Sequence, residues 1–267
     1  MSRRAIALAA LLVVPAGLGA QVAVNRSTTY LMPSDVQDAR AIWVNPAGLG
    51  VQSQASIYFD LTASDPGSRA QLRQLNLGFN ARGLSFAYQR DQFSGGTRGS
   101  TYKMGFGVGE GRLAVGAAAA LYRGDTKGTG WDLGASFKAA HPLVLALVVG
   151  NIGQPSVRGV EQRIRYTASG TLQVAPGFGV AALAAADPRG MQAYGLAAHA
   201  GFDWSFPVAL VARLDTDQKF RRQQFALGIS IGGTNQLGVI ATAPGDISSV
   251  NDLTVVGVAT RTAPARR

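Results

Sequence analysis

From Ala55 onward the chain repeats one pattern of hydrophobic and polar positions. Segments of about eight to twelve residues alternate in polarity, and turns rich in Gly, Pro, Asp or Asn separate them. In Gln74–Asn80, for example, the odd-numbered positions are Leu, Leu and Phe, and the even-numbered positions are Gln, Asn, Gly and Asn. A period of two residues is typical of a β-strand with one apolar face. The chain is therefore predicted to be all-β.

Fourteen segments carry this pattern, an even number as expected for a bacterial outer-membrane barrel. Some are ambiguous, because 142–151 and 177–186 are apolar on both faces and 251–261 can be read either way. Twelve or sixteen strands therefore remain alternatives. The segments are 55–62, 71–80, 83–90, 100–109, 112–123, 129–139, 142–151, 163–174, 177–186, 191–204, 207–216, 221–232, 235–243 and 251–261.

A soluble β-sandwich also alternates in polarity, so the period alone does not identify a membrane barrel. Two features of the faces favour a transmembrane antiparallel β-barrel. The polar face consists of Gly, Ser, Thr, Gln and isolated charges, too hydrophilic for a sandwich core, and the apolar face carries large side chains suited to lipid. Aromatic residues also stand near segment ends, where an interfacial girdle would place them. These are Tyr58, Tyr88, Tyr102, Tyr122, Trp131, Phe178, Tyr194, Trp204 and Phe206.

The links between segments predict the orientation of the barrel. Short links such as Ala81–Arg82 and Glu110–Gly111 suit periplasmic turns, whereas longer, Gly-rich links such as Asp91–Gly99 and Ile152–Gln162 suit extracellular loops. One link departs from this alternation, because Ala63–Ala70 is long where a short turn is expected.

Residues 1–20 have the layout of a secretion signal. Arg3 and Arg4 form a positive start, residues 5–14 an apolar core, and residues 15–20 an exit of small residues. The apolar run is shorter than a transmembrane helix, which needs about 20 residues. A buried N-terminal helix is the alternative. We expect an exported chain that resides in the bacterial outer membrane.

The composition agrees with export and narrows the partners. Charged residues make up only 15% of the chain. The sequence holds no Cys, which excludes disulfides, thiolate metal sites and Cys nucleophiles. A net charge of +10 is compatible with nucleic-acid binding, but the cations are scattered, and export argues against it. Lipid phosphates of the outer membrane, including those of lipopolysaccharide, are the expected partners for this charge.

Candidate catalytic and metal-binding residues are few. His141 lies in a turn, while His199 shares a strand face with Asp203, and both of the latter are predicted to point into the lumen. No nucleophile is predicted beside this pair, and two distant His residues make no metal constellation. We therefore expect no enzymatic activity, no metal and no cofactor.

The residues before the first strand differ from the rest, because they carry little strand pattern. One short helix is predicted over Ser34–Trp43, with Ser34 as its cap and Asn45 before Pro46 as its end. Gly residues on the polar faces of the strands would leave room for this segment inside the barrel. A surface-lying N-terminal arm is the alternative.

These observations predict four parts of the chain. Residues 1–20 are a signal peptide, 21–54 an N-terminal plug, 55–261 the barrel, and 262–267 a C-terminal tail.

The run Ala41–Gly50, with Asn45-Pro46-Ala47-Gly48-Leu49 at its centre, resembles the plug motif of the bacterial outer-membrane long-chain fatty-acid transporter (FadL) family. It is equally similar to the shorter proteins of the type IX secretion shuttle (PorV/PorQ-like) group. The resemblance implies an N-terminal plug inside a fourteen-stranded barrel. The order of plug and barrel is similar over the whole chain, but the residues themselves are similar only in this run.

The resemblance to the fatty-acid transporters implies passive, porin-like uptake of a hydrophobic small molecule, gated by the plug. Asn45, Pro46 and Gly48 would then fix the conformation of the plug, and Trp43 and Leu49 would make its apolar contacts.

The strand pattern adds candidate ligand contacts in the lumen. Arg163, Arg165 and Arg213 are possible partners for a carboxylate head group, and His199 is a further lumenal candidate.

Two features limit what the resemblance carries over. The chain is short for a fatty-acid transporter, and its last residues, 260–267, lack the terminal aromatic residue common in barrel assembly signals. The rival hypothesis is a closed, non-transporting barrel that scaffolds a secretion or envelope complex, as its PorV/PorQ-like resemblance implies.

Overall fold

The computed structural model of the protein describes residues 25–51, 55–92, 98–124, 128–157, 160–203 and 205–261. The predicted signal peptide, the predicted tail and Trp204 lie outside the described residues.

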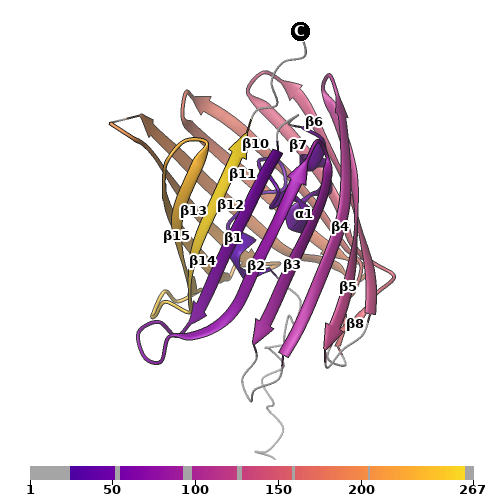
Figure 1. The fold of residues 1–267 in the computed structure, drawn as a ribbon, viewed down its shortest axis with the longest axis vertical. Helices are drawn as coiled ribbons and strands as arrows, with labels where there is room; N and C mark the ends of the chain where they lie inside the picture. The colour runs from indigo at the N-terminus through magenta and orange to yellow at the C-terminus, as the bar shows by residue number, and fades with distance from the viewer. Residues whose placement is uncertain are drawn as a thin grey trace, which may run out of the picture.

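Fourteen antiparallel strands form one closed barrel, which confirms the predicted fold class and strand number (Figure 1). Each strand pairs with its neighbours along the chain, and β1 pairs with β16 to close the wall. The strands are β1 (Ala55–Ser64), β2 (Gln71–Ala81), β3 (Leu84–Gln92), β4 (Arg98–Glu110), β5 (Leu113–Gly124), β6 (Gly128–Ala140), β7 (Leu143–Ile152), β10 (Arg165–Ala175), β11 (Phe178–Asp187), β12 (Gly190–Asp203), β13 (Pro207–Asp217), β14 (Arg222–Ile231), β15 (Asn235–Pro244) and β16 (Asp252–Arg261).

A small hairpin between β7 and β10 was not expected from the sequence. It consists of β8 (Ser156–Val157) and β9 (Val160–Glu161). Val157 packs with Ala120 and Tyr122, both on the inner face of β5. The hairpin therefore contacts the inner wall of the barrel.

The two faces of the wall have the predicted character. Large apolar side chains, such as Phe106 and Leu196, are exposed on the outside, while polar and small residues are buried inside. The strands that were ambiguous in sequence have apolar inner faces as well, for example Val148 on β7 and Leu183 on β11.

The aromatic girdle is only partly as expected. Tyr102 and Trp131 are exposed on the outer face, but Tyr58 and Tyr122 are buried inside the barrel. Their assignment to the girdle was wrong, because alternation along β1 places Tyr58 in phase with the buried polar residues Ser56 and Asp60.

The two ends of the barrel differ in their links. One end, uppermost in Figure 1, has two-residue turns such as 82–83, 111–112 and 141–142, and we call it the short-turn end. The opposite, long-loop end carries 153–164 and also 65–70. The link after β1 therefore belongs to the long-loop end, and expecting a short turn there was wrong.

Residues 25–51 lie within the ring of strands, where Figure 1 shows α1 in indigo. Their elements are η1 (Arg26–Thr28), α1 (Ala41–Val44) and η2 (Pro46–Gly50). The predicted helix over Ser34–Trp43 is wrong in extent. The Ser34 hydroxyl bonds to Thr171 of β10 at 2.7 Å, so a contact with the wall takes the place of a helix cap. No helix among the described residues is long and apolar enough to cross a membrane.

Candidate functional site: the inner segment and its wall

The segment 25–51, called the inner segment below, runs along the lumen from one end toward the other. At the long-loop end, Ser27 donates a hydrogen bond to the Asp60 carboxylate of β1 at 2.7 Å, and Arg26 forms an ion pair with Asp252 of β16 at 2.8 Å. Toward the short-turn end, η2 contacts β4, β5 and β6. The inner segment is thus held at both of its ends.

Asn45 is the polar centre of the short-turn half and is fully buried. Its Nδ2 donates to the carbonyl oxygen of Pro33 at 2.8 Å and to Ser136 Oγ of β6 at 2.9 Å. Its Oδ1 accepts the backbone N–H of Ala47 at 3.1 Å and so caps η2. Asn45 is extended, which ends α1 and leaves Pro46 at the first turn of η2, where a missing N–H costs nothing.

Gly residues of the wall make space for η2. A Cβ atom on Gly116 of β5 would lie 2.3 Å from the carbonyl oxygen of Pro46, and one on Gly107 of β4 would lie 2.6 Å from the nitrogen of Gly50. A Cβ on Gly134 of β6 would lie 2.1 Å from Asn45 Oδ1. Only Gly allows a backbone to approach this closely. The expectation that inward Gly residues make room inside the barrel is confirmed at these positions.

Gly48 and Leu49 pack within the segment itself and against the wall. A Cβ on Gly48 would lie 2.2 Å from the carbonyl oxygen of Val36, and the Leu49 side chain is fully buried. Gly48 therefore allows η2 to fold back against an earlier part of the inner segment.

A charged side chain of the wall holds α1. Lys103 Nζ of β4 donates to the carbonyl oxygen of Ile42 at 3.1 Å and forms an ion pair with Asp132 of β6. The same ammonium group lies 5.1 Å from the centre of the Trp43 ring, within range of a cation–π contact. Trp43 in turn donates its indole N–H to the Tyr58 hydroxyl.

Part of the wall that the inner segment covers is apolar. Tyr30 and Val36 belong to one cluster with Ile240 of β15 and Val256 of β16. Met32 belongs to a second cluster, with the inner residues Ala181, Leu183 and Ala185 of β11. We call the inner faces of β11, β12 and β14–β16 the apolar wall, and those of β1–β6, which carry most of the buried polar residues, the polar wall.

Most of the predicted lumenal ligand residues already interact with other groups of the protein. Arg213 donates to the carbonyl oxygen of Leu31 at 2.5 Å and pairs with Asp215 at 2.9 Å. Arg163 lies in the link before β10 and is 3.8 Å from Asp187.

His199 and Arg165 complete the predicted set. His199 Nδ1 lies 3.6 Å from Asp35 of the inner segment, on a strand face that points inward as expected. Arg165 begins β10 in phase with the buried Thr167 and Ser169, so it is on the lumenal face and exposed there. Arg165 is close enough to Arg213 and Asp215 to interact with their charges, whereas Arg163 and His199 approach Asp187 and Asp35.

Two kinds of functional residue were missed in the sequence. Lys103 was visible as an inward charge, because it is in phase with Gly105 and Gly107 on one face of β4, but its partners come from the inner segment and β6. Gly116 was equally visible as an inward Gly, but nothing in the sequence ties it to Pro46.

Asp38 and Arg40 form a buried ion pair at 2.6 Å within the inner segment. Burial alone would raise the pKa of Asp38, but the nearby guanidinium and its hydrogen bonds bring that pKa below its ordinary value. Among the described residues, no three His, Asp or Glu side chains are placed to hold a metal ion.

Comparison with solved structures shows a related architecture. The chain is similar in fold to the toluene transporter TbuX of Ralstonia pickettii, with a TM-score of 0.56 and 10% identity over 88% of this chain and 98% of the transporter. A triple mutant of Rhodopseudomonas blastica porin (TM-score 0.45, 7% identity, 78% of this chain and 99% of the porin) and the KdgM porin (0.39, 9%, 76% and 98%) are also matched.

The names of these neighbours describe a transporter and two porins. No protein-family model and no curated protein matches the sequence. The resemblance suggested by Ala41–Gly50 is confirmed at the level of the fold, a closed barrel like that of the toluene transporter.

Proposed function

We propose that the chain is an outer-membrane barrel for uptake of hydrophobic, fatty-acid-like small molecules, and that the inner segment is a plug that gates this uptake. One observation carries the proposal. The inner segment covers the apolar wall with Tyr30 and Met32, so its displacement would uncover an apolar path along the lumen. A hydrophobic molecule would gain by following that path out of water.

The exterior supports a place in the outer membrane. The exposed apolar face suits lipid, and a closed wall leaves no strand edge unpaired in the membrane. By the usual length rule for outer-membrane barrels, the short-turn end would face the periplasm and the long-loop end the cell exterior. Lipopolysaccharide phosphates would meet the basic residues of the loops.

A disulfide lock tests the gating. The Ser34 and Thr171 hydroxyl oxygens are 2.7 Å apart, so Ser34→Cys/Thr171→Cys would join the inner segment to β10. The chain has no Cys of its own, so only the intended pair can form. We expect uptake of a labelled fatty acid into proteoliposomes to fall at least tenfold in the oxidised form and to recover on reduction.

A second pair provides the matched control. The Thr62 and Thr254 hydroxyl oxygens are 2.8 Å apart, and both residues belong to the wall. Thr62→Cys/Thr254→Cys would join β1 to β16 within the wall and leave the inner segment without a crosslink, so oxidation should leave uptake unchanged. Equal uptake by the oxidised and reduced forms of the Ser34–Thr171 lock would show that the inner segment is not a gate.

One observation favours the rival function, a closed barrel that scaffolds an envelope or secretion complex. The backbone of η2 lies directly against Gly107 and Gly116, with no space for even a Cβ atom between them. Such tight seating also suits a lumen that stays shut. Wild-type protein that passes no probe would support this function over uptake.

A further inference from the structure

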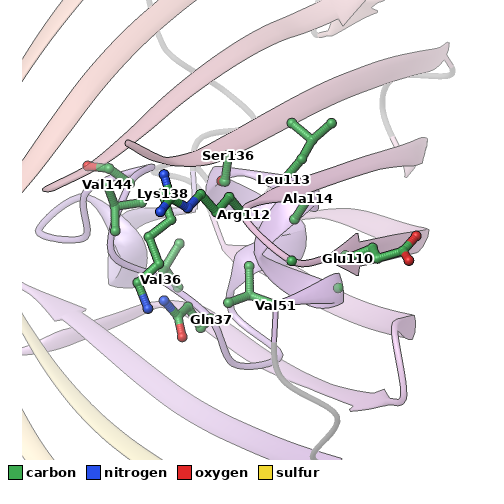
Figure 2. Close-up of a pocket in the computed structure, with 14 residues that line it drawn as sticks. Val36, Gln37, Val51, Glu110, Arg112, Leu113, Ala114, Ser136, Lys138 and Val144 are labelled. Atoms are coloured by element: carbon green, nitrogen blue, oxygen red, sulfur yellow. The ribbon is translucent and has the colours of Figure 1, made fainter. Parts of the chain in front are cut away.

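A cavity of about 320 Å³ opens at the short-turn end, beside Val51, the last described residue of the inner segment (Figure 2). Val36 and Val51 of the inner segment line one side of it, and Val144 of β7 lines another. This volume is at the small end of the range for ligand pockets, about 300–1,000 Å³. It suits a head group and a short part of an apolar tail.

Two cations reach into this cavity. Arg112 comes from the turn between β4 and β5, and Lys138 from the inner face of β6. The backbone N–H of Lys138 donates to the carbonyl oxygen of Arg112 at 2.8 Å, so Arg112, next to the start of β5, is paired with Lys138 on the adjacent strand. Figure 2 shows their side chains beside one another, while the carboxylate of Glu110 points away from both.

These cations differ from others that lie along the inner segment. Arg40, Lys103 and Arg213 each have a carboxylate partner. Among the described residues, no carboxylate lies within 4.0 Å of the charged nitrogens of Arg112 or Lys138. Two neighbouring like charges repel one another, and an anion between them would relieve that repulsion.

We propose that this cavity binds the carboxylate of an amphipathic molecule, with Arg112 and Lys138 as its charge partners and the three Val side chains against its tail. The site deepens the proposed function, since it lies where a cargo molecule would leave the lumen at the short-turn end. It adds a selective step for anionic cargo at this end of the barrel.

Binding in detergent solution tests the site without requiring transport. Radiolabelled octanoate, octyl phosphate and octanol are each equilibrated by dialysis with purified full-length protein. We expect wild-type protein to bind octanoate at least tenfold more tightly than octanol, and this preference to weaken as salt is added. Binding of octyl phosphate with no binding of octanoate would overturn the proposal in favour of a lipid phosphate.

A charge-matched pair of variants locates the effect. Arg112→Gln/Lys138→Gln should weaken octanoate binding at least tenfold and leave octanol binding unchanged. Arg82→Gln/Lys219→Gln removes the same charge outside the cavity and should leave both unchanged. Equal octanoate binding by the two double variants would overturn the proposal. A wild type that binds octanoate but passes no fatty acid would contradict only the uptake function.

Discussion

The inner segment lies between two unlike walls. The polar wall holds it by directional contacts, such as Asn45 with Ser136 and Lys103 with the Ile42 carbonyl, and by Gly residues that fit its backbone. The apolar wall packs on Tyr30 and Met32 through apolar side chains, whose contacts are not directional. Hydrogen bonds and steric fit fix one position, whereas apolar surfaces tolerate sliding. We infer that the polar wall determines where the segment sits and that the apolar wall allows it to move.

The apolar wall is not wholly without polar contacts. Between its strands, Arg213 of β13 reaches the Leu31 carbonyl, and His199 of β12 approaches Asp35. This gives a direct comparison, because Lys103 of the polar wall and Arg213 of β13, which lies between strands of the apolar wall, each bond to a backbone carbonyl of the inner segment.

The largest expected effect is from Lys103→Met on the polar wall. It would leave Asp132 without its cation in a mostly buried site and remove the bond to Ile42. Breaking a buried ion pair from one side costs about 3–5 kcal/mol. We expect a clearly lowered thermal unfolding temperature by circular dichroism in detergent.

The matched variant on the other side is Arg213→Met. Its partner Asp215 is no better buried than Asp132, but nothing like the Trp43 contact is lost. We expect a smaller loss of stability. An equal or larger loss for Arg213→Met would remove the distinction between the walls.

Gly116→Ala should have an intermediate effect. Its Cβ would collide with the Pro46 carbonyl oxygen, and overpacking of this kind costs about 1–3 kcal/mol. Because the displaced part is the inner segment, trypsin should cut after Arg40 sooner than in the wild type.

Gly201→Ala on β12 is the control for this variant. Its Cβ would come no closer than 3.7 Å to a neighbouring atom, so we expect a change below about 0.5 kcal/mol and an unchanged rate of cleavage. Equal cleavage of the two variants would show that the Gly residues do not position the inner segment.

The smallest effect concerns pH. Because the pKa of Asp38 is lower in the folded protein, its contribution is fully present above the ordinary value of about 4 and is lost as the pH falls through the lowered value. Stability attributable to Asp38 should therefore be flat between pH 5 and 8. The difference in unfolding temperature between wild type and Asp38→Asn should shrink only below about pH 4. A difference that shrinks between pH 8 and 6 would contradict this assignment.

The barrel could be predicted from the sequence because, in a strand with one apolar face, the polarity of each residue indicates whether it points outward or inward. The period of two predicts the correct, inward orientation of Tyr58. Its assignment to the girdle rested instead on the general preference of aromatic residues for the membrane interface. The prediction of a helix over Ser34–Trp43 was wrong for another reason. The Ser34 hydroxyl, expected to cap the helix, bonds instead to Thr171 of β10. Arg112 and Lys138 could not be paired in advance, because their proximity depends on the register of β5 against β6.

The pairing of β1 with β16 has a consequence for biogenesis. The seam joins the first strand of the wall to the last, so the ring can shut only after the whole chain has arrived. Such a long-range contact is costly in loop entropy and forms late. The inner segment precedes β1 and contacts β4, β5 and β6, all of which come well before the seam. If the inner segment associates early with β4, β5 and β6, the growing sheet can curve around it. The pairing of β1 with β16 would then close the barrel last.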